Sequence, residues 1–239
     1  MLREIVLDMR RIPPFHQRVY EVARAIEKRL DHPLFTDAYL TGLGATVPAG
    51  LVPFTIEAAD PRHYVSRLLR RMDACRLPIV ARVNGHALAG GFGLVCACDL
   101  VVASDDAAFG LPEVTRGLIA AAGGLYRLPR VLPRPVALEL ILTADTLSAA
   151  DALRLGWLNR VVPAARVMDE ALALARRITR NAPVAVRESL QIARQAADLD
   201  EAQLRTLSLQ ARKRVQATED YREGPRAFIE KRPPRWSGR

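Results

Sequence analysis

The sequence predicts an α/β fold: a layered, largely parallel core over residues 1–163 and an all-helical region over residues 164–239. In the first part, short apolar runs typical of buried strands alternate with segments of helical periodicity. Strands that are separated by helical crossovers pair in parallel within a layered α/β core. After Pro163 glycine becomes rare and helix-forming residues dominate. We therefore expect two regions that meet near this proline.

Each element is predicted from a local pattern. Apolar runs bounded by turn residues predict strands at residues 5–7, 38–40, 77–83, 100–103 and 158–162, with a short extended piece at 109–114. Apolar residues at helical spacing predict helices at 15–30, 61–75, 90–98, 135–143, 148–156, 167–178, 183–197 and 201–217. Ser148 is a good N-cap and Gly156 a good C-terminal stop for the helix between them.

Composition narrows the function classes. The 239 residues carry 35 Lys and Arg against 26 Asp and Glu, a net charge of +9, which suits nucleic acid or a phosphorylated small molecule. The arginines are spread along the chain, and six Phe and five Tyr offer little base stacking, so we do not expect nucleic-acid binding. Three cysteines (Cys75, Cys96 and Cys98) give neither a disulfide framework nor metal-ligand spacing. No apolar run approaches the roughly 20 residues of a membrane span, so we expect a soluble cytoplasmic protein with no metal and no membrane contact.

The segment from Asn84 to Asp99 organises the rest of the chain. It follows a predicted buried strand and reads N-G-H-A-L-A-G-G-F-G-L-V-C-A-C-D. Gly90 and Gly91 open a predicted helix whose first turn is almost bare of side chains, which lets a ligand approach backbone N–H groups. Such a helix start favours developing negative charge, as in an oxyanion site. The alternative is that the glycine pair only permits close packing of the helix on the strand.

Several linked motifs resemble the crotonase family of enoyl-CoA hydratases and isomerases. They are N-G-H-A-L-A-G-G at 84–91, F-G-L-P-E-V at 109–114, A-A-A-G-G-L-Y-R-L-P-R at 120–130, L-T-A-D-T-L-S-A-A-D-A-L-R-L-G-W-L-N-R-V-V at 142–162, and E-D-Y-R-E-G-P-R-A-F-I-E-K-R at 219–232. The resemblance implies a spiral of ββα units followed by a helical region that builds homotrimers, often paired into hexamers. It also implies an acyl-CoA or enoyl-CoA substrate, with coenzyme A as part of the substrate and no separate cofactor.

The resemblance also assigns roles to residues. Members of the family stabilise a thioester enolate with two backbone N–H groups, which match Gly90 and Ala49 here. Glu113 matches a catalytic carboxylate, and a glutamate directly after a proline in an apolar piece is in its own right a candidate general base. The substrate-binding candidates are Gly93, Tyr126, Phe228 and Lys231. His86 follows the turn pair and is a weaker catalytic candidate.

Position 93 departs from the family pattern. Hydratases of the family carry a second catalytic glutamate three positions after the oxyanion glycine, where this chain has Gly93. Hydration needs two carboxylates, whereas moving a double bond needs one base that takes a proton from one carbon and returns it to another. We therefore expect proton transfer of the isomerase type rather than efficient hydration. The alternative is a catalytically impaired protein that binds CoA thioesters or serves in assembly.

Overall fold

The computed structural model describes residues 38–41 and 64–239, with side chains described from residue 69 onward. The chain divides into two compact units. The core unit comprises Met1–Cys75 and Ile79–Leu172, and the helical unit comprises Arg76–Pro78 and Ala173–Arg239. The domain boundary after residue 163 stays a prediction. The strand predicted at 5–7, the helix predicted at 15–30 and the oxyanion candidate Ala49 lie outside the described residues.

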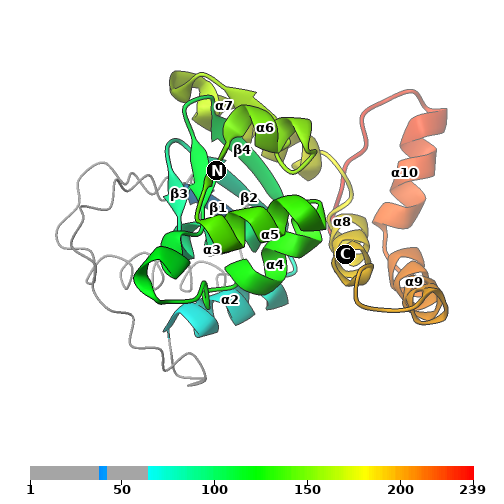
Figure 1. Ribbon diagram of the computed structural model, residues 1–239. Helices are drawn as coiled ribbons and strands as arrows, with labels where there is room; N and C mark the ends of the chain where they lie inside the picture. The colour runs from blue at the N-terminus through cyan, green and yellow to red at the C-terminus, as the bar shows by residue number, and fades with distance from the viewer. Residues whose placement is uncertain (1–37, 42–63) are drawn as a thin grey trace. The chain divides into compact units, whose positions relative to one another are not determined.

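The main sheet of the core unit has four parallel strands: β1 (Ala38–Thr41), β2 (Ile79–Val83), β4 (Leu100–Ser104) and β7 (Arg160–Val162), in the order β1-β2-β4-β7. Val80 pairs with Leu100 and Val102 with Arg160. Figure 1 shows β2 and β4 within this unit. The parallel α/β core is confirmed, because successive strands of this sheet are joined by helical crossovers, as their apolar runs predicted.

A second, smaller sheet is made of three short strands, β3 (Ala87–Leu88), β5 (Ala108–Gly110) and β6 (Thr146–Ser148), in that order. Strand β3 pairs with β5 in parallel, and β5 pairs with β6 in antiparallel fashion. Strands β3 and β6 were not predicted, since two or three residues carry too little alternation to reveal a strand.

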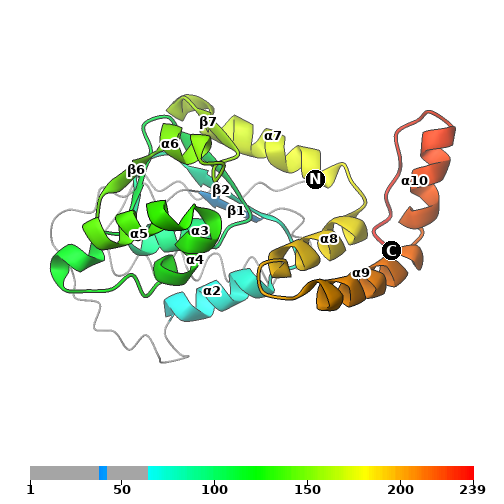
Figure 2. The same cartoon turned by 45° about the vertical axis from the view of Figure 1, so that its right-hand side comes forward.

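The helices of the core unit are α2 (Tyr64–Ala74), α3 (Gly90–Cys96), α4 (Gly124–Val131), α5 (Arg134–Thr143) and α6 (Ala149–Arg154), with a 3-10 helix, η1, at Pro112–Arg116. Helices α3, α4 and α5 lie side by side (Figures 1 and 2). Three aromatic rings form one cluster. The Phe92 centroid lies 5.6 Å from that of Phe109 and 5.2 Å from that of Trp157. Phe92 and Phe109 are fully buried, so this cluster anchors α3 to β5.

Two sequence-based predictions for this unit need correction. The extended piece predicted at 109–114 holds only to Gly110, because Pro112 begins η1; a proline suits the first position of a helix. Helix α4 was not predicted, since Pro129 lies inside it. By contrast, the Ser148 cap is confirmed: its hydroxyl accepts a hydrogen bond from the Asp151 amide at 3.1 Å.

Polar side chains at strand ends bind neighbouring backbone in reciprocal pairs. The amide of Asp99 donates to the Ile79 carbonyl, while its carboxylate accepts from the Ile79 amide at 2.7 Å. Asn159 makes the same arrangement with Val101, at 2.9 Å to the carbonyl and 2.7 Å from the amide. Each pair satisfies buried backbone groups where strands begin, so both side chains set the register of the main sheet.

The helical unit contains α8 (Pro183–Gln195), α9 (Glu201–Gln216) and α10 (Asp220–Ile229). Helix α7 (Val167–Thr179), preceded by the 3-10 helix η2 (Ala164–Arg166), spans the boundary between the units. The predicted ranges of α7, α8 and α9 agree within two residues with the observed ones. Helix α10 was not predicted as a separate helix, since Gly224 and Pro225 interrupt its pattern. In the described part of the chain no helix is both long and apolar enough to cross a membrane.

A buried carboxylate organises the packing of α8. Glu188 is only 5% exposed. It accepts hydrogen bonds from Arg214 of α9 at 2.8 and 2.6 Å, and from Arg76 at 2.9 Å. The hydrogen bonds from Arg214, followed by the charges of the arginines, hold the pKa of Glu188 below its ordinary value. Burial of this charge is tolerated because two guanidinium groups compensate it.

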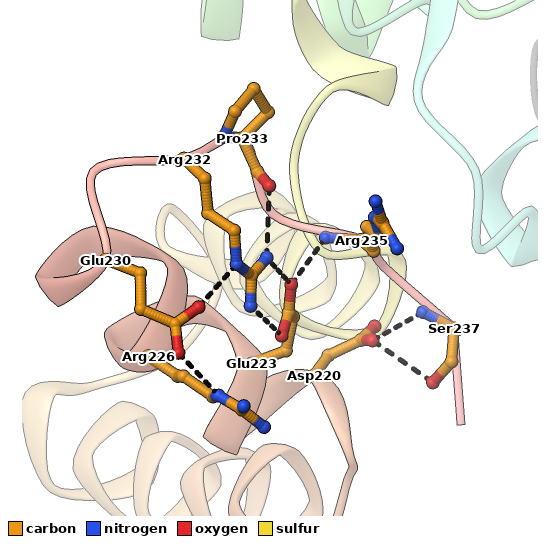
Figure 3. Close-up of polar contacts among 8 residues, drawn as sticks. All are labelled: Asp220, Glu223, Arg226, Glu230, Arg232, Pro233, Arg235 and Ser237. Carbon is orange, nitrogen blue, oxygen red and sulfur yellow. Dashed lines mark hydrogen bonds and ion pairs between the residues drawn. The ribbon is translucent and has the colours of Figure 1, made fainter.

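The last eight residues fold back onto α10 through two carboxylates of its first turn (Figure 3). Glu223 binds the guanidinium of Arg232 at 2.6 and 3.0 Å and the amide of Arg235 at 2.7 Å. Asp220 accepts from the amides of Ser237 and Gly238 at 2.7 and 3.1 Å. We call residues 232–239 the tail.

We expect Asn159→Ala to lower the free energy of unfolding by about 1–3 kcal/mol, because it leaves the buried Val101 amide without its acceptor. Arg154→Ala removes an exposed ion pair with Asp151 and should leave the free energy of unfolding close to that of the parent. Urea denaturation of the two variants compares them; equal losses would contradict the role given to Asn159.

We also expect the tail to detach in acid. The hydrogen bond from Arg232, followed by the Arg235 amide, lowers the pKa of Glu223 to about 2. Because the folded pKa lies below the ordinary glutamate value of 4.5, the stabilisation of the tail by Glu223 is complete above that value and is lost as the pH falls toward 2. Trp236, whose indole N–H donates to the Arg180 carbonyl, reports on the tail by fluorescence in a Trp157→Phe background.

The matched variants are Glu223→Gln and Glu201→Gln, the second at an exposed glutamate of α9 that pairs with Arg205 of the same helix. The first should show the detached Trp236 spectrum already at pH 7, with helical circular dichroism unchanged, and the second should behave as the parent. An identical spectrum for both variants at pH 7 would show that Glu223 does not hold the tail.

Candidate active site

The candidate site lies where two parallel strands end at the same edge of the smaller sheet. In β3 and β5, Leu88 pairs with Gly110, and the next amide, that of Ala89, donates to the Gly110 carbonyl at 2.9 Å. Gly90 begins α3 directly after β3, and Glu113 follows β5 within η1. The pairing therefore brings the predicted oxyanion amide and the predicted base to one edge, although 23 positions separate them in the sequence.

The start of α3 presents backbone amides without a side-chain cap. Ala89, the N-cap residue, has a positive φ of 52°, which is uncommon for a residue with a Cβ, and its side chain makes no capping hydrogen bond. The first hydrogen bond of the helix runs from the Gly93 amide to the Ala89 carbonyl, at 3.1 Å. The Gly90 amide precedes this bond and is thus one of the unpaired donors of a helix start. This arrangement can donate a hydrogen bond to an anionic oxygen.

Glu113 is half-buried, and its Oε2 is a buried atom without a hydrogen-bond partner in the described part of the chain. Loss of hydration raises the pKa of Glu113 above its ordinary value, against the opposing effects of its own backbone amide and the Arg116 charge. A desolvated carboxylate with an unpaired oxygen is a stronger proton acceptor than one in water. Such groups are enriched at functional sites.

The small-residue segment Ala120–Gly124 packs between α3 and Leu111, which comes two positions before Glu113. A Cβ at Gly124 would lie 2.8 Å from a methyl carbon of Leu111, and one at Gly90 would lie 3.7 Å from the Ala122 Cβ. The segment is therefore packed between Leu111 and the first turn of α3. It was visible in the sequence as a run of Ala and Gly, but nothing in that run revealed which backbone it would touch.

Gly93 is buried in this same packing. A Cβ built on Gly93 would lie 2.1 Å from the Ala122 carbonyl oxygen, far inside contact distance. The space next to residue 93 is thus filled by backbone. Whether Gly93 contributes to substrate binding stays a prediction.

Tyr126 lies in α4, in the same unit, and its side chain is 55% exposed. The guanidinium of Arg127 lies 5.4 Å from the Tyr126 ring centroid, and its Nη2 lies 2.9 and 2.8 Å from the two carboxylate oxygens of Asp73. This ion pair ties α4 to α2. Tyr126 thus has an exposed ring next to a fixed positive charge.

The predicted site residues are divided between the two units. Phe228 and Lys231 belong to the helical unit, where both are exposed, and Lys231 has a φ of 52°. His86 is exposed in the core unit.

Burial raises the pKa of the Cys96 thiol to about 12, so it stays protonated and packs as part of the core. Across residues 69–239 no group of three or more His, Cys, Asp or Glu side chains could hold a metal ion.

Comparison with known proteins decides the family. The sequence profile described as "Enoyl-CoA hydratase/isomerase" matches residues 21–239. The chain belongs to the enoyl-CoA hydratase/isomerase family. Among curated relatives, the carnitinyl-CoA dehydratase of Proteus mirabilis is 42% identical over 166 residues, covering 68% of this chain and 64% of that protein. The Escherichia coli (strain K12) protein of the same name is 41% identical over 166 residues, with the same coverage. The matched region thus spans 64% of the length of these relatives.

Solved structures of enoyl-CoA hydratase/isomerase relatives share the fold. An enoyl-CoA hydratase/isomerase from Mycobacterium paratuberculosis matches with a TM-score of 0.82 and 30% identity, covering 94% of this chain and 89% of that one. An enoyl-CoA hydratase from Mycobacterium tuberculosis matches with a TM-score of 0.79 and 35% identity, covering 92% and 87%. The crotonase-like fold predicted from the motifs is confirmed.

Burial of the Glu113 carboxylate predicts a stability effect with a definite sign. Because its folded pKa is raised, ionisation of Glu113 opposes folding as the pH rises through that pKa. We expect Glu113→Gln to unfold at a higher denaturant concentration than the parent at pH 7, and the difference to shrink as the pH falls toward 4. Urea midpoints at the two pH values test this. A difference that is equal at both, or that grows in acid, would show that the carboxylate is not desolvated.

Proposed function

We propose that this chain catalyses proton transfer on the acyl group of a coenzyme A thioester, with Glu113 as the acid–base residue and the Gly90 amide as an oxyanion donor. The observation that carries the proposal is the desolvated Glu113 carboxylate, with a buried unpaired oxygen, at the same sheet edge as the uncapped start of α3. The names of the relatives support a CoA thioester as the substrate class.

In the proposed reaction the Glu113 carboxylate removes a proton from the α-carbon, the saturated carbon between the thioester carbonyl and the double bond. The electron pair of the broken C–H bond moves toward the thioester oxygen and forms an enolate. The Gly90 amide, and by family resemblance the Ala49 amide, donate hydrogen bonds to this oxygen, where the charge develops. The protonated Glu113 then returns its proton to a different carbon, so the double bond moves and no atom is gained or lost.

Double-bond migration is favoured over hydration because Glu113 is the only carboxylate assigned an acid–base role among the described residues. Addition of water needs a second group to hold and activate the water while Glu113 acts at carbon. Position 93, where hydratases of the family carry that group, is a buried glycine. A raised pKa suits a residue that both takes and gives back a proton, since it narrows the free-energy gap between the two forms at neutral pH.

The remaining assignments complete the proposal. Tyr126 and Gly93 contribute to the acyl side of the site. By family resemblance, Phe228 and Lys231 reach the coenzyme A of a neighbouring subunit, where a lysine suits the phosphates. The coenzyme A moiety belongs to the substrate, and no separate cofactor takes part. Assembly as a homotrimer or hexamer is implied by the resemblance, and the low cysteine count and the lack of a long apolar run support a cytoplasmic location. The alternative function, binding of CoA thioesters without turnover, draws support from the glycine at position 93.

We expect Glu113→Gln to lower the exchange of substrate α-protons with deuterium oxide by about 10²–10⁴-fold, because the amide cannot accept the proton. Exchange is followed by mass spectrometry on a panel of enoyl-CoA chain lengths, together with double-bond migration and hydration. For the parent, exchange should decline in acid with an apparent pKa above the ordinary glutamate value, since the carboxylate is the active form.

The matched control is Glu139→Gln, at an exposed glutamate of α5. It should exchange at the parental rate. Thioester binding, measured by calorimetry, should survive in both variants. Binding without any exchange in the parent would favour the non-catalytic alternative, and unchanged exchange in Glu113→Gln would show that another group is the base.

A further inference from the structure

The space beside residue 93 is occupied by the peptide backbone of another segment. A Cβ on Gly93 would lie 2.1 Å from the Ala122 carbonyl oxygen, 3.0 Å from the Ala122 carbonyl carbon and 3.5 Å from the Gly124 amide nitrogen. These are main-chain atoms, so no side-chain rotation can relieve the overlap. Any residue other than glycine at position 93 must move α3 or the segment Ala120–Gly124.

This segment is held on its other sides as well. A Cβ on Gly124 would lie 2.8 Å from Leu111 and 3.2 Å from the Ala120 Cβ, so the segment has little freedom to shift away from α3 in that direction. Gly123 has a φ of 93° and packs against the side chain of Arg127, which is fixed by its ion pair with Asp73. The Leu125 amide donates to the Ala120 carbonyl at 3.4 Å and closes the turn.

Gly90, which begins α3, is not enclosed by the backbone of another described segment. A Cβ on Gly90 would meet, in the described part of the chain, only the Ala122 Cβ, at an ordinary contact distance of 3.7 Å. The two glycines therefore have different structural reasons. Gly90 leaves its amide accessible, whereas Gly93 makes room for a carbonyl.

We infer that the Ala122 carbonyl is a specificity-determining group of this site, because it fills the volume that a catalytic side chain at position 93 would need. This inference rests on the proposed function and extends it. Restriction to one carboxylate is then a property of the backbone around α3, and replacing a single side chain cannot add the second acid–base group. The site is thereby committed to chemistry that Glu113 can carry out alone.

The experiment compares Gly93→Ala and Gly93→Glu with Gly90→Ala in the full-length protein. We expect both Gly93 variants to melt at least about 5 °C below the parent, and Gly93→Glu to melt lowest, since a side chain at this position overlaps fixed backbone. Gly90→Ala should melt within about 2 °C of the parent. Gly93→Glu should hydrate crotonyl-CoA no faster than the parent does.

A second background identifies the atom responsible. Ala122→Gly removes the methyl group but leaves the carbonyl, so Gly93→Ala should lower the melting temperature as much in the Ala122→Gly background as in the parent. Recovery of most of the loss in the double variant would assign the contact to the Ala122 side chain and overturn the inference.

The remaining outcomes are decisive too. A Gly93→Glu protein that melts with the parent and gains hydration by about tenfold or more would overturn the inference, as would a Gly93→Ala protein of unchanged melting temperature. Failure of Gly93→Glu to fold supports the inference if Gly93→Ala folds with the expected loss. Absence of proton exchange in the parent would defeat the proposed function, while the melting temperatures would still report on the backbone contact.

Discussion

The parallel pairing of β3 and β5 is the constraint on which the candidate site depends. Two short strands, joined at their ends by the hydrogen bond from the Ala89 amide to the Gly110 carbonyl, bring the start of α3 and the start of η1 to one sheet edge. The ring cluster of Phe92, Phe109 and Trp157 stabilises this arrangement, since it joins α3 to β5. The uncapped start of a helix and a desolvated carboxylate thus follow strands that end at one sheet edge, an arrangement of the backbone that a side-chain pattern alone does not encode.

Local features of the site are unfavourable for stability and are compensated by the surrounding packing. Ala89 adopts a positive φ, and Glu113 keeps a buried carboxylate oxygen without a partner. Such features persist where the surrounding structure is strong enough to impose them. Here the buried α/β core around β2 and β4 supplies that strength, and the reciprocal pairs made by Asp99 and Asn159 fix its register.

Much of this architecture could be predicted from the sequence, and the failures have physical causes. Helices α7, α8 and α9 and strands β2 and β4 follow their apolar periodicity, because burial on one or both faces dictates the residue pattern. Helix α10 escaped notice because Gly224 looks like a helix break; the residue is small because the Trp236 ring lies 3.3 Å from the position of its missing Cβ. Glu113 could be singled out from its motif, whereas the 3-10 helix that carries it could not.

The role of Ala122 lay beyond sequence reasoning for a related reason. A main-chain carbonyl has no residue-specific signature, and its position depends on contacts of Leu111, Gly124 and Arg127 that are distant along the chain. Gly93 looked like a residue that had lost a function. In the structure it is also a residue that accommodates a neighbour.

The order of strands in the main sheet has a consequence for biosynthesis. Strand β7 lies beside β4 but is made more than fifty residues later, after every element of the candidate site in the core unit. A nascent chain that has emerged only as far as Val131 therefore presents an unpaired β4 edge to other polypeptides, since open edges readily recruit other strands. Synthesis through Val162 covers that edge, and until then the growing polypeptide is most exposed to aggregation.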